Sequence, residues 1–499
     1  MKTLLVNPNR TYASSGTQAP VVALPLGLLW IAACFEQQKL LVRLLDCLNQ
    51  PETRISETGS GSSLGISREV IEEHLLAEKP DLVGIGCPFT AQWENALEVL
   101  RISRALLPQS TIVLGGPHAT VCANEILREN PEVDYILAGE GEESLPLLAR
   151  VLQGEARRED VPGLIWRNVD GEVTANPLKP IENLDTLPLP AYHLYDFQRY
   201  FDLQSRGFYV RGVRPKSVSI ITSRGCPFTC TFCSIHLSMG HKWRAHSAAY
   251  TLHHMRYLID QYGVSHFQIE DDNFTLKRAR VEEICRGLIA EDKQITWETP
   301  NGVRADLLSD DLLITMKQSG CIELAIAAES GDQKVLDTIV KKKLNLQSIE
   351  NAAKLAHRHD IRLGCFFVIG FPGETKKQIR KTIHFALRLY RKYNCFPMLN
   401  VATPLPGTEL TRIVQEKGYL ADRMTAKNLA SATSREGRGL IRTEEFDPDF
   451  IQTLCAAFRT QVRLIHLFYL LTHLRALREE LHSHMRRLIS RPHPSSARS

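Results

Sequence analysis

The sequence is poor in several features that would assign a chain to a class at once. Its 499 residues contain no unbroken apolar run of about 18 residues, so we expect no membrane-spanning helix. The first residues, MKTLLVNPNR, lack the long apolar stretch of a signal peptide. The net charge of +4 is small for this length and gives no reason to expect a nucleic-acid partner. We therefore expect a cytoplasmic protein.

The composition is that of a globular chain, with 43% hydrophobic and 23% charged residues, and its length predicts two or three domains. Twelve cysteines are present, and a reducing compartment leaves them unpaired. Nine stand singly, mostly in apolar runs, and are expected to be buried small hydrophobes: Cys34, Cys47, Cys87, Cys122, Cys285, Cys321, Cys365, Cys395 and Cys455. The other three lie together in RGCPFTCTFC.

The first 153 residues alternate short apolar strands with helical patterns, which predicts a doubly wound parallel sheet. Several of these strands end directly in glycine or proline, as at Gly115 and Gly116, and His118 follows. Open parallel sheets bind ligands at the carboxyl ends of their strands, where small residues let a ligand approach the backbone. We therefore expect a ligand site at this edge.

The cysteine cluster has the spacing C-x3-C-x2-C at Cys226, Cys230 and Cys233, directly after the predicted strand SVSIITSRG. Zinc would need a fourth ligand, which one of three downstream histidines could supply. These are His236, His241 and His246. An iron–sulfur cluster would instead use three thiolates and leave one iron open for a substrate or cofactor.

A second strand–helix alternation follows the cluster, with strands within 266–274, 295–304, 321–331, 361–375 and 397–410. This order indicates a partial (β/α)6 barrel, in which working residues lie at the carboxyl ends of the strands. The rule selects Asp271, Asp272, Glu329, Ser330 and Gly370 as site candidates. Arg304 is also selected, with a structural ion pair as an equal alternative.

Two known groups resemble these segments. The motif Cys-x3-Cys-x-Phe-Cys, with Phe232 as its aromatic residue, resembles the signature of the radical S-adenosylmethionine (SAM) superfamily. LLVNPN, VLGGPHAT and YILAGEGE resemble the cobalamin-binding domain fused in front of some of these enzymes. The stretch Asp46-Cys47-Leu48-Asn49-Gln50 departs from the Asp-x-His-x-x-Gly motif of other cobalamin domains, so no lower cobalt ligand is expected there.

The combined resemblance is to cobalamin-dependent (class B) radical SAM methyltransferases and to the anaerobic magnesium-protoporphyrin ester cyclase group. It implies a [4Fe-4S] cluster on Cys226, Cys230 and Cys233, with SAM and cobalamin as further cofactors. It implies SAM contacts at Asp271, Asp272, Glu329, Ser330 and Gly370. Gly115, Gly116 and His118 would border cobalamin, although a packed polar loop residue is an alternative for His118.

The resemblance implies an enzyme that uses a 5′-deoxyadenosyl radical to place a methyl group on an unactivated carbon of a small-molecule or lipid-like, for example hopanoid-type, substrate. An oxidative cyclase or rearrangement enzyme of tetrapyrrole or natural-product biosynthesis is the first alternative. A metal-binding protein without turnover is the second. An electron donor such as flavodoxin or ferredoxin is the expected partner.

The chain is thus expected to comprise a cobalamin-type domain (1–153), a linker (154–214), a radical SAM core (215–420) and a C-terminal helical region (421–499) with a disordered tail. Leucines recur at helical steps near 447–490, among several arginines. One interpretation is a helix that caps the barrel. The other is a basic amphipathic helix at the inner membrane surface or against a lipid-like substrate.

Overall fold

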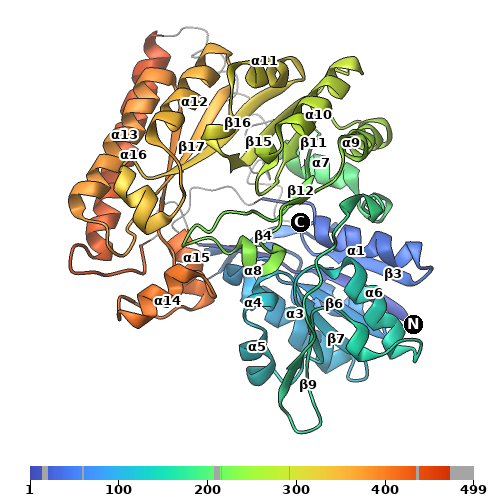
Figure 1. The fold of residues 1–499 in the computed structure, drawn as a ribbon. Helices are drawn as coiled ribbons and strands as arrows, with labels where there is room; N and C mark the ends of the chain where they lie inside the picture. Colours follow the sequence, from blue (N-terminus) through green and yellow to red (C-terminus); the bar gives the residue numbers. More distant parts are fainter. Residues whose placement is uncertain are drawn as a thin grey trace, which may run out of the picture.

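The structure is a computed structural model that describes residues 1–13, 21–58, 61–206, 214, 216–291, 293–433 and 438–472. Figure 1 shows two lobes, each built on a largely parallel sheet. We call the blue-to-teal one the N-terminal lobe and the green-to-orange one the barrel lobe.

The N-terminal lobe holds a seven-stranded sheet in the order β10-β9-β8-β7-β6-β1-β3. The five strands from β8 to β3 are parallel, and helices pack on them through two buried apolar clusters. The strands are β1 Lys2–Asn7, β3 Leu41–Asp46, β6 Leu82–Gly86, β7 Thr111–Gly115 and β8 Tyr135–Leu137. The helices are α1 Leu26–Gln37, α2 Arg68–Glu78, α3 Trp93–Leu106, α4 Pro117–Val121, α5 Ala123–Glu129 and α6 Gly141–Leu152.

The expected linker is partly built into this lobe. Strands β9 Leu164–Arg167 and β10 Val173–Ala175 form the hairpin that WRNVDGEV predicts, and β9 joins β8 antiparallel. The later part of the linker carries α7 Phe197–Ser205 and a buried group of aromatic rings around Tyr192. These rings share one apolar core with α1 and with the barrel lobe, so the segment joins the lobes as a packed layer. A small second sheet, β2 Arg10–Ala13, β5 Gly61–Gly65 and β4 Arg54–Thr58, lies in the same lobe.

The barrel lobe is a six-stranded, all-parallel sheet in simple order, as the sequence predicts. Its strands are β11 Ser217–Ile220, β14 His266–Ile269, β15 Thr296–Val303, β16 Cys321–Glu329, β17 Arg362–Ile369 and β18 Phe396–Val401. The helices between them are α9 Ala248–Tyr262, α10 Arg278–Ala290, α11 Asp310–Gln318, α12 Leu346–Arg358 and α13 Lys376–Tyr393. Local signals define some ends: Thr375 and Gln378 form a capping box at the start of α13.

The single cysteines follow the expectation with one exception. Eight of the nine are buried, and Cys122, in the turn between α4 and α5, is half-exposed. The C-terminal region contains α14 Glu409–Glu416, α15 Ala426–Thr433 and α16 Pro448–Thr472. The predictions for 473–490 and for the final residues lie outside the described part of the chain.

Helix α16 is the described helix that bears on the expectation of no membrane-spanning helix. By length and composition it could cross a membrane, with a mean hydropathy of 1.2 in its most apolar window, which by itself is weak evidence. The sequence showed no uninterrupted apolar run there because Arg459 and Arg463 interrupt the leucines. Ile451, Cys455 and Phe458 are buried in the first half of the helix.

A buried ion network fastens the two lobes together. Arg224, after β11, pairs with Glu140 at 2.7 Å and with Glu142 at 2.5 Å, both at the start of α6. Arg244 pairs with the other Glu140 oxygen at 2.6 Å. Arg224 is 6% exposed and stacks on the Trp30 ring of α1. Burial opposes the charge of Glu140, but the two arginines outweigh it and lower the pKa of this carboxyl.

Replacing Glu140 by glutamine is expected to reduce the free energy of unfolding by about 3 kcal/mol, because two buried guanidinium groups lose their shared carboxylate. Urea unfolding at pH 7 measures this loss. The matched control is Glu182→Gln, which breaks the exposed pair with Lys242 and should cost at most about 1 kcal/mol. Because its pKa is lowered on folding, Glu140 stabilises fully above its usual pKa of 4.5 and loses that effect as pH falls through the folded pKa. Equal losses in the two variants would contradict the network's role.

Candidate active site

The cysteine loop, residues 225–233, starts from a position that only glycine tolerates. Gly225 has φ +78°, and a Cβ there would lie 2.6 Å from the Lys242 carbonyl oxygen. Its N–H donates to the Asp272 carboxylate at 3.0 Å. The loop then carries Cys226, Cys230 and Cys233, all partly exposed and unpaired. The loop thus presents three accessible thiols from one anchored turn.

The three thiols carry raised pKa values because burial disfavours their thiolates, and for Cys233 the pKa reaches about 11. The metal-free thiols are therefore protonated at neutral pH and release protons when they bind iron.

The far side of the loop is held by two other segments. Thr231 donates from its N–H to the Val340 carbonyl at 3.2 Å and from its hydroxyl to the Ile339 carbonyl at 3.0 Å. The Thr231 carbonyl accepts from the N–H of Leu410 at 2.8 Å. The Phe232 ring lies 5.7 Å from Phe371, directly after β17. The segment Val335–Val340 and α14 therefore hold the loop by hydrogen bonds, and the turn after β17, at the carboxyl end of a barrel strand, packs on its Phe232 ring.

The two aspartates after β14 have different surroundings. The Asp271 carboxylate is buried and accepts from the hydroxyls of Thr222 and Ser223 at 2.7 and 2.6 Å. Asp271 therefore holds the segment that leads into the cysteine loop. Asp272 accepts from Gly225, and burial raises its pKa to about 6. Asp272 lies directly at the loop.

The two residues predicted at the end of β16 also have different surroundings. Glu329, with φ +62°, forms a buried ion pair with Lys342 at 2.7 Å. The Ser330 hydroxyl is fully buried and lies 3.0 Å from that of Thr382 in α13. Glu329 thus belongs to the charged surroundings of the cysteine loop, whereas Ser330 joins the strand to a helix.

The turn after β17 is covered by the C-terminal region. Gly370 has φ +89°, and a Cβ there would touch Ile451 of α16 at 3.5 Å. The N–H groups of Gly370 and Phe371 donate to the Glu374 carboxylate at 2.8 and 2.9 Å. Burial raises the pKa of Glu374 to about 7.

Arg304 and Lys342 complete the surroundings of the loop. The Arg304 guanidinium stacks on Phe228 of the cysteine loop at 3.9 Å and also pairs with Asp306. Arg304 is therefore both a structural ion pair and a neighbour of the loop. Lys342 was missed in the sequence, where it is the middle one of three consecutive lysines.

The glycine edge of the N-terminal lobe lies where the sequence places it. Gly116 has φ +101°, and a Cβ there would lie 2.8 Å from the Cys87 carbonyl oxygen; Gly115 ends β7. The His118 ring is 3.1 Å from the Thr90 hydroxyl and 5.2 Å from the Trp93 ring centroid. Burial lowers its pKa to about 4, so the imidazole is neutral at pH 7.

The carboxyl ends of the two sheets meet. Helix α8 Ile235–Met239 follows the cysteine loop, and a Cβ on Gly407 would touch both Leu237 of α8 and Val121 of α4 at 2.9 and 2.8 Å. In Figure 1, α8 and β12 Ser223–Arg224 lie between the lobes, and α8 is beside α4. The cysteine loop therefore faces the glycine edge of the other lobe.

The described residues contain no ready-made site for a single zinc ion. Within the described residues, no three His, Cys, Asp or Glu side chains gather as ligands of one metal ion. His246 is buried and stacks on Tyr250 at 4.0 Å, and His236 stacks on His241 at 4.7 Å. Three thiols spread over eight residues suit ligation of three different irons.

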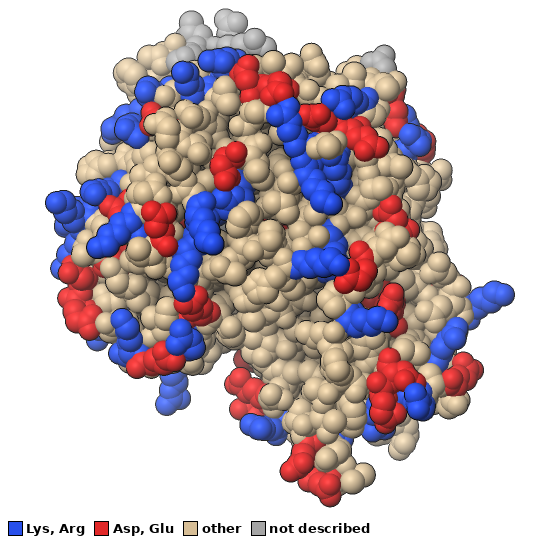
Figure 2. Space-filling model, viewed as in Figure 1, with Lys and Arg blue, Asp and Glu red and all other residues tan. Residues whose placement is uncertain are grey.

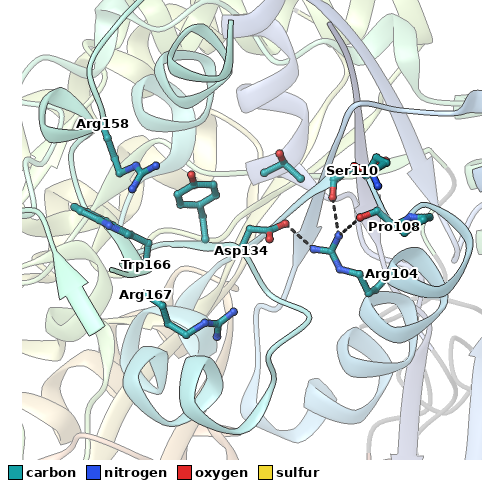
Figure 3. Close-up of a pocket in the computed structure, with 10 residues that line it drawn as sticks. Arg104, Pro108, Ser110, Asp134, Arg158, Trp166 and Arg167 are labelled. Carbon is teal, nitrogen blue, oxygen red and sulfur yellow. Dashed lines mark hydrogen bonds and ion pairs between the residues drawn. The ribbon is translucent and has the colours of Figure 1, made fainter. Parts of the chain in front are cut away.

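A pocket of about 360 Å³ lies at the opposite, amino edge of the N-terminal sheet (Figure 3). Arg104 in it donates to the Pro108 and Ser110 carbonyls and pairs with Asp134. Arg167 donates to main-chain carbonyls at the end of α5. Two of the arginines that line the pocket thus stabilise local structure, and the pocket is remote from the cysteine loop.

On the face in Figure 2, charges of both signs are interspersed, in keeping with the small net charge.

Comparison with known proteins agrees with this geometry. Residues 220–386 match the Radical SAM superfamily and residues 16–149 match the B12 binding domain. An uncharacterized methyltransferase of Pyrococcus horikoshii is 31% identical over 82% of this chain and 82% of its own length. Cytidylyl-2-hydroxyethylphosphonate methyltransferase of Streptomyces wedmorensis is 29% identical over 84% and 82%.

The anaerobic magnesium-protoporphyrin IX monomethyl ester cyclase of Rubrivivax gelatinosus is 30% identical over 72% of this chain and 62% of its own length. Among solved structures, the cobalamin-dependent SAM radical enzyme OxsB, with aqua-cobalamin and SAM bound, superposes with a TM-score of 0.71 at 18% identity. The match covers 91% of this chain and 66% of OxsB, and it confirms the predicted fold class.

The chain is thus a radical SAM enzyme with an N-terminal B12-binding domain. It belongs to the family of cobalamin-dependent radical SAM methyltransferases, which is homologous to the magnesium-protoporphyrin cyclases. Its cofactors are a [4Fe-4S] cluster, SAM and cobalamin.

Replacing Cys230 by alanine is expected to abolish cluster assembly, because two thiolates cannot hold three irons of the cluster. Iron and sulfide content and visible absorption after anaerobic reconstitution measure the effect. Cys122→Ala is the matched control, since Cys122 is also partly exposed but lies outside the loop. Full iron content in Cys230→Ala would contradict this ligand assignment. Stoichiometric zinc instead of iron in the parent protein would restore the zinc alternative.

Proposed function

We propose that the chain transfers a methyl group to an unactivated carbon of a small-molecule or lipid-like substrate. The observation that carries the proposal is the meeting of two edges. The cysteine loop and the glycine edge of the B12-binding domain face each other across the ion network of Arg224, Glu140 and Glu142. Cofactors held on the two sides would share one space.

When bound, the cluster supplies the electron that cleaves SAM, and cobalamin carries the methyl group. The chain's own residues hold these cofactors in place. The proposed ligands are Cys226, Cys230 and Cys233, and Gly225 with Asp272 fixes the approach of their loop. Gly115, Gly116 and the neutral His118 would border cobalamin.

All five SAM contacts expected from the sequence are still proposed, but the structure supports a direct contact for some of them and a positioning part for others. Asp272 and Glu329 lie at the cysteine loop and can present carboxylate oxygens to a cationic amine. Gly370 lies in a turn with positive φ whose Cα side packs on Ile451, so its proposed SAM contact is made through the main chain. Asp271 and Ser330 are engaged with protein groups, so their proposed part is to position these neighbours. The proposed domain limits remain 1–153, 154–214, 215–420 and 421–499.

The activity is tested by anaerobic reconstitution with a reductant, SAM, cobalamin and a candidate substrate. Methyl transfer predicts both 5′-deoxyadenosine and S-adenosylhomocysteine, with a product heavier by one methyl group. 5′-Deoxyadenosine without S-adenosylhomocysteine would instead favour cyclase or rearrangement chemistry. Neither product from a protein that holds its full cluster would overturn turnover altogether and leave a metal-binding protein.

The proposed electron donor is a flavodoxin or a ferredoxin, and the proposed location is cytoplasmic and peripheral to the inner membrane. Exposed apolar side chains on the second half of α16 support the membrane contact. Leu464, Leu467, Phe468 and Leu471 are 61%, 53%, 69% and 65% exposed at steps of three, one and three residues, so they share one helix face. The following residues, 473–499, contain six arginines and two glutamates, which suits an anionic lipid surface.

The double variant Leu467→Ser/Phe468→Ser is expected to lose at least about tenfold in vesicle binding, because each buried Leu or Phe side chain contributes about 1.5–3 kcal/mol. Sedimentation with vesicles of phosphatidylcholine and phosphatidylglycerol measures it. Ile289→Ser, at an exposed apolar residue of α10, is the control and should bind as the parent does. No binding of the parent chain to these vesicles would overturn the membrane contact without touching the methyl-transfer proposal.

A further inference from the structure

Three consecutive lysines follow the π-helical segment Val335–Val340, and the structure treats them differently. Lys341 is exposed and pairs with Glu409 at 2.6 Å, and Lys343 is also exposed. Lys342 between them is 7% exposed and pairs with the buried Glu329 at 2.7 Å. A lysine is seldom buried in this way, because removing its ammonium from water is costly unless a partner compensates.

The backbone turns Lys342 inward. Lys341 and Lys343 both have positive φ values, +58° and +52°, which non-glycine residues adopt only when their surroundings impose them. Arg304 donates to the carbonyls of Lys342 and Lys343 at 3.1 and 3.0 Å, and the Lys342 N–H donates to Leu336 at 3.0 Å. The buried position is therefore built from several independent contacts.

The same segment is the one that clamps the cysteine loop. The carbonyls of Ile339 and Val340 bind Thr231, the residue directly after Cys230. Arg304, which holds the Lys342 carbonyl, stacks on Phe228 of the loop. The buried Lys342 thus belongs to a set of contacts that reaches the loop on both sides of Cys230, at Phe228 and at Thr231, which brings its charge close to the thiols.

We propose that Lys342 is a positioning residue that balances the charge of the three-thiolate cluster and thereby raises its reduction potential. Reduction adds one electron to the bound cluster, and a buried positive charge favours the more negative, reduced state. The negative charge of Glu329 opposes the rise in reduction potential. In the metal-free chain it compensates the cost of burying the Lys342 ammonium. The inference rests on the cluster, which the family assigns, and is independent of the substrate and of methyl transfer.

The test measures the midpoint potential of the anaerobically reconstituted full chain, without substrate, by dithionite titration followed by electron paramagnetic resonance. Lys342→Met removes the charge and should shift the midpoint to a more negative value by about 59 mV or more, which is a tenfold change in the reduced-to-oxidised ratio. Lys342→Arg should retain most of the parent's potential. Lys341→Met is the matched control and should leave it unchanged, because an exposed charge is screened.

Glu329→Gln supplies an independent arm with the opposite sign. It removes the negative partner and should shift the midpoint to a more positive value. If Lys342→Met fails to hold a cluster, the isosterically milder Lys342→Gln replaces it: a negative shift supports the proposal, and no shift overturns it. A Lys342→Met protein with full iron content and the potential of the parent or of Lys341→Met would also overturn it. The midpoint potential tests the proposal whether or not a methylated product is found.

Discussion

The arrangement of the whole site depends on the buried charges around Glu140. This carboxylate receives Arg224 on one oxygen and Arg244 on the other, and Arg224 also binds Glu142. Ion pairs this deeply buried contribute little net stability compared with apolar packing, but they are strict about geometry, because any displacement leaves a charge without a partner. The network therefore fixes how the lobes face each other more than how tightly they adhere. Arg224 stands two residues before Cys226, so the same contact also sets where the cysteine loop begins.

From that starting point the cysteine loop is bound on both sides. Gly225 and Asp272 hold its start, and Thr231 is held from the segment after β16. None of these contacts uses a cysteine side chain. The thiols remain available, and the loop geometry does not rely on the metal alone. This separation explains how a chain can leave one iron of a cluster open without losing the position of the other three.

Much of this could be predicted from the sequence, because strand ends and thiol spacing are local signals. Three barrel strands end within two residues of an acid or glycine that the pattern marks, at Asp271, Glu329 and Gly370, and the three cysteines fall within eight residues. The ion network could not be predicted in this way, since Arg224 and Glu140 are 84 residues apart and surface arginines are common. The residues GEGEE after β8, read together with an arginine beside the cysteines, were the only hint.

Other features escaped prediction because they depend on backbone conformation. The three lysines at 341–343 are equivalent as letters, and only the left-handed φ values of the outer two turn the middle one inward. Asp271 and Ser330 match the expected motifs by position, but their oxygens are taken by neighbouring hydroxyl and amide groups. Position at a strand end therefore predicts proximity to the site, whereas hydrogen bonding decides whether a side chain is free to meet a ligand.

Helix α16 connects the turn at Gly370 with an exposed apolar surface. Its first half packs Ile451 against the turn at Gly370, directly after the fifth barrel strand, while its second half presents Leu464, Leu467 and Phe468 outward. The helix rises about 1.5 Å per residue, so the exposed apolar face lies about 20–25 Å along the axis from the turn that borders the proposed SAM site. The membrane contact proposed for the outer half and the SAM contact proposed at Gly370 therefore involve the two ends of one helix.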